Sequence, residues 1–409
     1  MRYLVLLIQF SFLHLATPSG VFVQGGSYGV CRRTFSPSFL EQVPFCQRRS
    51  YLYPIPAASV ADDGRWEGPA NCLHGFCLYS TARRDSVLVT NGENAKAVMS
   101  MLSVDQRRAH GSSNQAQEEE MFRVAEVPGK GIGLIAKRLI REGDEVMVRR
   151  PSLVVQVAAQ ARINLQLRDE LYGRALDAVS HDTRQKLMAM VGHDLGDKID
   201  KNCFRLRMGA DEAVDSADHY LACYPDVARL NHDCRPSLVY SIENGTHTVS
   251  AVRDISVGEE LSISYIRLLS PRAQRLAELR HWGFECSCAQ CTMSNMQAAQ
   301  SDARLRAISG LEADLDNSRQ KLVMPETGHV LVDLYEQERL HVYMGRAYTK
   351  AALNYAAFGM EEEAERYAKL AAEAAKRESG SGSADFESMK SLSENPTAHW
   401  IWGYRLEEH

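Results

Sequence analysis

The sequence predicts an α+β fold that continues into a helical C-terminal region, and three observations predict it. Between about residues 121 and 265, short β-branched runs are separated by turn residues, as expected of small sheets. A stretch from about 164 to 191 interrupts these runs with apolar residues at helical spacing. Beyond residue 267, nearly every segment has the pattern of a helix.

Length and composition limit the class of protein. The chain has 409 residues, which suggests two or three domains at roughly 150 residues each. Its 47 basic and 52 acidic residues give a net charge of −5, so no overall basic excess favours a nucleic-acid partner. Hydrophobic residues at 45% and charged residues at 24% exclude a polytopic membrane protein, collagen, a long coiled coil and a disulfide miniprotein.

Residues 1–24 resemble a secretory signal. Met1 and Arg2 precede an apolar run that reaches Ala16, and small residues follow it. The run is too short and too polar to span a bilayer, so we expect no transmembrane segment. This start predicts the secretory pathway. A buried N-terminal element or a wrongly assigned start codon are the alternatives, and they would leave a nuclear or cytoplasmic protein.

Residues 25–104 form a cysteine-containing N-terminal region rich in Pro, Gly and Ser. We expect a strand at 87–90, a turn at Asn91 and Gly92, and a short helix at 94–102. Two disulfides or free thiols are both compatible with the four cysteines of this region, and no pairing is predicted: Cys31, Cys46, Cys72 and Cys77. Residues 105–120, with three consecutive glutamates, read as a polar linker that buries nothing.

The next domain is expected over residues 121–292. Its predicted strands are 122–127, 134–136, 145–148, 153–157, 238–242, 248–252 and 260–265. A glycine cluster at 129–133 interrupts the first pair, and the turn dipeptide Asn244-Gly245 joins two later strands. Cys203 and Cys223 stand singly in the sequence.

The C-terminal region, residues 293–409, is expected to be helical and follows a helix that Ser270 and Pro271 begin. Helices over 331–358 and 361–376, divided at Gly359, predict a hairpin that resembles one tetratricopeptide unit. A plain helical bundle is the alternative. The alternating serines and glycines of residues 379–383 predict a flexible loop.

A tight cysteine group suggests a metal site. Cys286, Cys288 and Cys291 follow a Cys-x-Cys-x-x-Cys spacing, which is costly to pack unless the thiolates bind a metal ion. Cys234 can supply the fourth ligand of a tetrahedral structural zinc site. Disulfides in an oxidising compartment are the competing interpretation, and they would make the chain a secreted protein without metal.

The order of these motifs resembles SET-domain protein lysine methyltransferases with a post-SET cysteine segment. The resemblance covers about residues 121–292 and rests on residues 231–236 (Asn-His-Asp-Cys-Arg-Pro), 257–265 and 284–291. The helical insert and the helical tail look like the SET-and-MYND group and its fungal relatives, although we expect no MYND finger here. The resemblance implies small sheets with a pseudoknot.

The resemblance also implies a role for each matching residue. Tyr265 matches the catalytic tyrosine. The cofactor-binding positions for S-adenosylmethionine would be Lys130, Gly131, Gly133, Asn202, Asn231, His232, Tyr265 and Phe284. The structural zinc ion (Zn2+) would be held by Cys234, Cys286, Cys288 and Cys291. Asn202 matches more weakly than the others, through an Asn-x-Phe element.

The expected function is S-adenosylmethionine-dependent methylation of a lysine in a histone or another protein, by a monomer. One departure matters, because the family motif usually ends in Pro-Asn and here Ser237 follows Pro236. Serine replaces only part of the hydrogen bonding of an asparagine amide. A catalytically degenerate SET-fold protein that binds a peptide as a scaffold is therefore the alternative.

Overall fold

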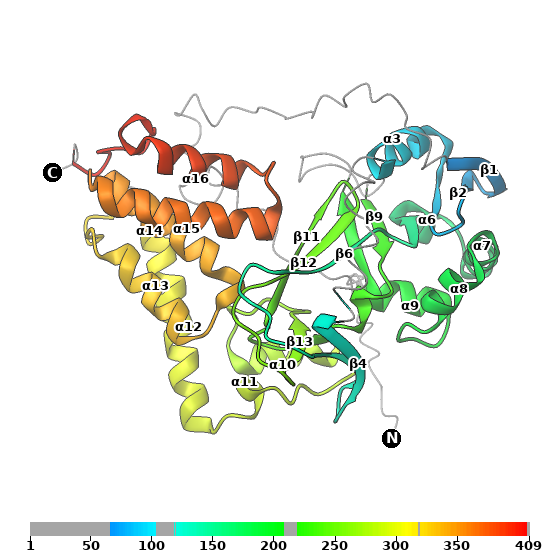
Figure 1. Cartoon of the computed structure of the whole chain (residues 1–409), viewed down its shortest axis with the longest axis horizontal. Helices are drawn as coiled ribbons and strands as arrows, with labels where there is room; N and C mark the ends of the chain where they lie inside the picture. The colour runs from blue at the N-terminus through cyan, green and yellow to red at the C-terminus, as the bar shows by residue number, and fades with distance from the viewer. Residues whose placement is uncertain (1–65, 104–117, 119, 208–218, 318–319, 407–409) are drawn as a thin grey trace, which may run out of the picture.

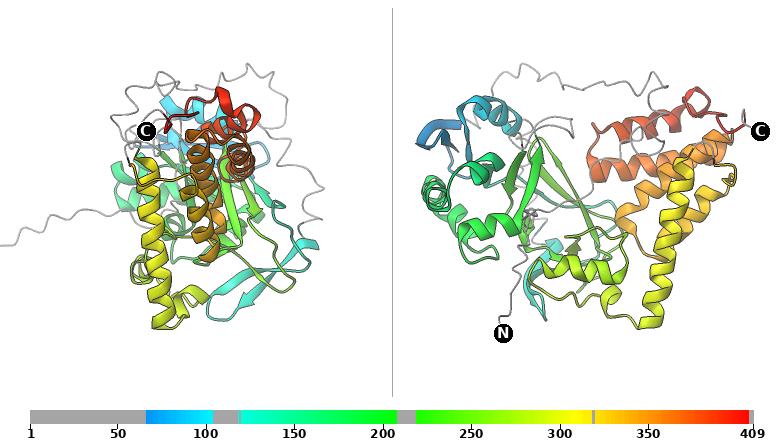
Figure 2. Two further views of the ribbon diagram at one scale, coloured as in Figure 1. Left: turned by 90° about the vertical axis from the view of Figure 1, so that its left-hand side faces the viewer. Right: turned by 180° about the vertical axis from the view of Figure 1, so that it is seen from behind.

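The computed structural model describes residues 66–103, 118, 120–207, 219–317 and 320–406 (Figure 1). The predicted signal segment, Cys31, Cys46 and most of the predicted linker lie outside these residues. The strands near the middle of the molecule have helices α6–α9 and strands β1 and β2 toward one end and helices α12–α16 toward the other, as the front and back views agree (Figure 2). The predicted α+β architecture with a helical C-terminal region is confirmed.

The largest sheet has six strands in the order β1-β2-β3-β7-β9-β8. It joins the predicted N-terminal region to the later strands, because β3 pairs in parallel with β7. Successive residues of each inner strand enter different cores, Val87 on one face and Leu88 on the other. The strands are β1 (Trp66–Leu73), β2 (Phe76–Thr81), β3 (Val87–Asn91), β7 (Leu153–Gln156), β8 (Cys203–Arg207) and β9 (His219–Cys223).

Two smaller sheets lie beside it. One has the order β10-β13-β5-β4, and the other has the order β11-β12-β6. Their strands are β4 (Phe122–Val127), β5 (Gly131–Ala136), β6 (Glu145–Arg149), β10 (Asn231–His232), β11 (Leu238–Glu243), β12 (Thr246–Ala251) and β13 (Glu260–Ile263). Asn244 and Gly245 both have positive φ, so the predicted turn joins β11 to β12. β10 pairs in parallel with β13, which brings Asn231 opposite Ser262.

The helical insert is longer than predicted. It comprises α6 (Val157–Arg162), α7 (Leu165–Ala178), α8 (His181–Met188) and α9 (Leu195–Asn202). The last three helices start where a polar side chain accepts a backbone N–H of the first turn, at Asn164, Ser180 and Asp194. Their apolar faces pack on the six-stranded sheet.

The C-terminal region is helical, as expected. Its helices, with the two that precede it, are α10 (Arg272–Arg280), α11 (Ala289–Thr292), α12 (Asn295–Asp316), α13 (Thr327–Gln337), α14 (Met344–Ala357), α15 (Glu361–Ser379) and α16 (Ala384–Glu394). Tyr355 and Tyr367 stack across the α14–α15 hairpin, which Gly359 divides at φ +68°. The tetratricopeptide likeness of this hairpin stays a prediction. A single helix over 331–358 was wrong, because α13 ends at Gln337 and Arg339 adopts a left-handed φ of +54°.

Two local predictions near the N-terminal strands were also wrong. Asn91 and Gly92 do not form a turn, because the Asn91 side chain accepts the Asn94 N–H at 3.0 Å and begins helix α3 (Gly92–Ser103). The linker does bury a residue, since Glu118 lies against Arg149 with a 2.7 Å hydrogen bond.

Within the described ranges, four cysteines form two disulfides. Cys72 pairs with Cys77 across the β1–β2 hairpin. Cys203 and Cys223, which stand singly in the sequence, pair with each other because β8 and β9 place them directly opposite. Because 20 residues separate the two cysteines, the sequence alone did not predict this second disulfide.

Among the helices of the described ranges, none combines the length and the apolar character that crossing a bilayer requires.

Candidate active site and metal centre

Four cysteine sulfur atoms converge, one from the segment after β10 and three from the segment around α11. Those of Cys234, Cys286, Cys288 and Cys291 all lie within 4.8 Å of one another. A zinc ion bound to four thiolates at about 2.3 Å holds its sulfur atoms roughly 3.8 Å apart. Hydrogen bonding among the four sulfur atoms lowers the pKa of Cys286 and Cys288 and raises that of Cys234 and Cys291. Thiols packed this closely cannot all carry a negative charge unless a cation neutralises it. The four predicted ligands therefore come together in a geometry that fits zinc.

His232 links this cluster to the segment that follows β13. Its Nδ1 accepts the main-chain N–H of Tyr265 at 3.0 Å, so the ring proton is on Nε2. Nε2 lies 3.3 Å from Cys234 Sγ and donates toward it. The ring is 3% exposed, and both of its nitrogen atoms are used inside the protein. The side chain thus connects Tyr265 to the cysteine cluster.

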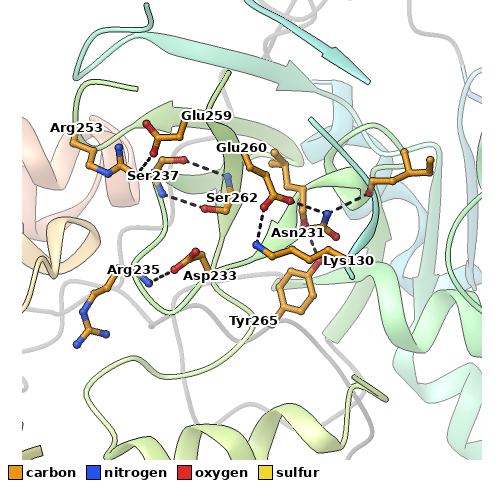
Figure 3. Close-up of polar contacts among 12 residues, drawn as sticks. Lys130, Asn231, Asp233, Arg235, Ser237, Arg253, Glu259, Glu260, Ser262 and Tyr265 are labelled. Atoms are coloured by element: carbon orange, nitrogen blue, oxygen red, sulfur yellow. Dashed lines mark hydrogen bonds and ion pairs between the residues drawn. The ribbon is translucent and has the colours of Figure 1, made fainter. Parts of the chain in front are cut away.

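A polar group joins Lys130 of the β4–β5 turn to Glu260 on β13 and Asn231 on β10 (Figure 3). Glu260 accepts from Lys130 Nζ at 2.6 Å and from Asn231 Nδ2 at 2.9 Å. Burial lowers the pKa of Lys130, but the hydrogen bond and charge of Glu260 outweigh it and raise that pKa above its ordinary value. A Cβ at Gly133 would lie 2.7 Å from Asn231 Nδ2, so only glycine permits this close approach. Gly131 has φ +81°, which glycine also favours.

Tyr265 lies among aromatic rings immediately beyond β13. Its ring centroid is 5.0 Å from that of Trp282, 6.1 Å from that of Phe284 and 5.4 Å from that of His232. The phenol donates to the main-chain oxygen of Leu230 at 2.7 Å. Burial, with a smaller contribution from Glu260, raises the pKa of Tyr265. The phenol therefore stays neutral at physiological pH.

Ser237 is fully buried and pairs with Ser262. Its Oγ accepts the Ser262 N–H at 3.2 Å, and its own N–H donates to Ser262 Oγ at 3.4 Å. This reciprocal pair braces the end of the loop against β13, as Figure 3 shows. The serine that departs from the family motif is therefore satisfied by a second serine.

The hydrogen bonds of the Asn202 side chain go to other residues, and its cofactor-binding role stays a prediction. Its side-chain amide ends α9 by donating to the main-chain oxygens of Val191 and Lys198, each at 2.7 Å. Phe204, the aromatic residue of the predicted Asn-x-Phe element, packs against Tyr224 with ring centroids 5.9 Å apart.

Sequence reasoning missed two residues of the site. Glu260 holds both Lys130 and Asn231, and Trp282 is the nearest aromatic neighbour of Tyr265. Glu260 could be found only from the pairing of β13 with β5, which places a carboxylate beside the glycine turn. The sequence indicates a site role for Trp282 only through its position two residues before Phe284.

Comparison with known proteins matches residues 131–266 to the SET domain family. N-lysine methyltransferase SMYD2-B of Danio rerio is 42% identical over 88 residues, which are 21% of this chain and 20% of that protein. N-lysine methyltransferase SMYD2 of Homo sapiens is 38% identical over 84 residues, which are 20% of this chain and 19% of that protein. The crystal structure of CpSET8 from Cryptosporidium aligns over 46% of this chain and 82% of that one, at 14% identity and a TM-score of 0.22.

These matches are limited in extent. The chain spans about a fifth of the length of the two methyltransferases, and the TM-score with CpSET8 is too low to bear on the fold. The family match nevertheless includes Gly131, Asn231, His232 and Tyr265, and it ends shortly before the last three cysteines of the metal centre. This match assigns residues 131–266 of the chain to the SET domain family.

Proposed function

We propose that this chain is a protein lysine N-methyltransferase that uses S-adenosylmethionine and holds a structural zinc ion. The observation that carries the proposal is the position of Tyr265. Its main chain is bonded to His232, which contacts the metal-binding Cys234, and its ring adjoins Trp282. One tyrosine is thus fixed between a metal centre and an aromatic cluster. Lysine methylation is also the activity named for the SMYD2 relatives.

The glycine turn fits the methyl donor. A Cβ at Gly129 or Gly131 would meet nothing within 4 Å, so the backbone there is open to a ligand. The cation of Lys130 and the amide of Asn231 suit the carboxylate of an amino acid. Together with Gly133 they would hold the cofactor. When bound, S-adenosylmethionine supplies a methyl group already activated on a sulfonium sulfur.

The aromatic cluster suits the substrate amine. A lysine must lose its proton before its nitrogen can attack, and burial among apolar rings disfavours the ammonium form. Trp282 and Phe284 would exclude water beside Tyr265. Because the pKa of Tyr265 is raised, its neutral phenol acts by orienting the amine rather than by removing a proton.

The zinc ion would have a structural role. Four cysteine ligands leave no open coordination position, so the metal would fasten two distant segments rather than take part in the reaction. One of these segments carries Cys234 and the other carries Cys286, Cys288 and Cys291. Both are within reach of Tyr265 through His232 and Phe284.

Methyl transfer from labelled S-adenosylmethionine into cell-extract proteins tests the proposal. We expect the wild-type chain to label protein lysines, and Tyr265→Phe to lose on the order of a hundredfold or more of that rate. The matched control is Tyr224→Phe, because Tyr224 also donates to a main-chain oxygen, that of Gly245 at 2.9 Å. It should keep its rate. If wild type bound the cofactor without transferring methyl, the enzyme proposal would fail and the scaffold alternative would gain. Mass spectrometry of the labelled proteins would identify the substrate.

A further inference from the structure

A buried ionic cluster forms around Glu338, which directly follows α13. The carboxylate of Glu338 accepts from Arg235 Nη2 at 2.6 Å, from Ser301 Oγ at 2.7 Å and from Arg304 Nε at 2.6 Å. Its main-chain oxygen also accepts from Arg235 Nε. The Glu338 side chain is 1% exposed and that of Arg235 is 4% exposed. This carboxylate is therefore shared among three donors without contact with water.

The cluster reaches directly into the site, because Arg235 follows the metal-binding Cys234 in the chain. Arg235 Nη1 donates to the main-chain oxygen of Cys234 at 2.6 Å. The Arg235 N–H donates to the Asp233 carboxylate at 2.8 Å, and the Asp233 N–H donates to Ile263 of β13 at 3.0 Å. The guanidinium thus connects Glu338 to residues 231–237, which we name the cofactor loop.

The helices of the C-terminal region fix Glu338 from the other side. Ser301 and Arg304 lie three residues apart on α12, so both point at the same neighbour. Arg339 has a left-handed φ of +54°, so the chain turns away from the axis of α13 immediately after Glu338. Cys234 and Cys288 share one apolar core with α12, α13 and α14. The cofactor loop is therefore anchored at Glu338, 103 residues beyond Arg235, and Glu338 is in turn held by α12.

We propose that Glu338 is a positioning residue through which the C-terminal helices hold the cofactor loop in its binding geometry. The inference rests on the proposed function, because the loop carries Asn231 and the first metal ligand. Without the Glu338 carboxylate, Arg235 would be a buried cation facing Arg304, and it would move toward solvent. The Cys234 main chain that it holds would move with it.

The test compares two variants that each remove one buried carboxylate charge from the same helical region. Glu338→Gln breaks the link to the cofactor loop. Glu312→Gln is the matched control, because the Glu312 carboxylate accepts from Tyr335 and from Arg346, each at 2.6 Å, and neither of these partners belongs to the loop. A purely structural role predicts the same behaviour for both variants. A positioning role predicts that only Glu338→Gln changes the loop.

Hydrogen exchange of the full chain, measured by mass spectrometry, reads the cofactor loop without requiring any activity. We expect the amides of residues 231–237 to exchange about tenfold faster in Glu338→Gln than in Glu312→Gln. Calorimetry should give a dissociation constant for S-adenosylmethionine about tenfold higher in Glu338→Gln, with Glu312→Gln close to wild type. Equal loop exchange in the two variants would overturn the proposal.

A milder variant covers the case in which Glu338→Gln does not fold. Arg235→Lys keeps the charge but loses the fork that reaches both Glu338 and Cys234, so it should show a smaller acceleration of loop exchange. Exchange at the wild-type rate in Arg235→Lys would likewise overturn the proposal. Absence of methyl transfer by the wild-type chain would contradict the proposed function alone, because the exchange result does not depend on it.

Discussion

Lowering the pH is expected to destabilise the fold through one buried imidazole, that of His247 on β12. Its ring lies 4.6 Å from Phe204, 4.7 Å from Tyr240 and 4.9 Å from Tyr224, and neither nitrogen has a hydrogen-bond partner in the structure. Burial lowers its pKa from 6.5 to about 3. Between these values the unfolded chain binds a proton that the fold excludes, so the free energy of unfolding falls as the pH is lowered. Linkage gives a loss of about 2 kcal/mol at pH 5 relative to pH 7.5.

Urea unfolding at pH 7.5 and pH 5.0 measures this loss. His247→Leu removes the titrating ring, so its free energy of unfolding should fall by about 2 kcal/mol less than that of wild type between the two pH values. Burial also lowers the pKa of His399, to about 4, and that contribution is present in both proteins and cancels in the comparison. His281→Gln, which changes an exposed histidine, should behave as wild type. Equal pH dependence in wild type and His247→Leu would refute the reasoning.

Three further predictions concern the site. His232→Phe leaves the Tyr265 N–H without its acceptor, so the free energy of unfolding should fall by about 1–3 kcal/mol and methyl transfer should slow. Unchanged values in urea unfolding and rate assays would contradict the proposed role of His232 in holding Tyr265. Ser237→Ala leaves the buried Ser262 N–H unpaired and should lower the free energy of unfolding by about 1–3 kcal/mol, which thermal and urea unfolding would detect. Chelation of zinc should increase protease cleavage near the cofactor loop and abolish cofactor binding, and retention of binding by the metal-free protein would count against the structural role.

Much of the fold could be predicted because its signals are local. The β11–β12 hairpin combines β-branched strands with the dipeptide Asn244-Gly245, and each part favours the same structure. The cysteine trio was visible for the same reason, since its three members fall within six residues. By contrast, β8 contains the two arginines Arg205 and Arg207, and β9 begins with His219, so their apolar patterns are weak. The pairing of β9 with β7 and of β8 with β9, rather than local propensity, makes these segments strands.

The residues that escaped prediction are those whose role depends on a distant contact. Ser237 suggested a weakened site when only the missing amide could be considered, yet Ser262 supplies the complementary donor and acceptor. Glu338 resembles any acidic residue at the end of a helix until its carboxylate is seen to hold Arg235. Such pairs leave no periodicity or spacing in the sequence, because the fold alone brings their members together. If the cofactor loop is held in this way, activity in this chain should be sensitive to changes in helices that contact neither cofactor nor substrate.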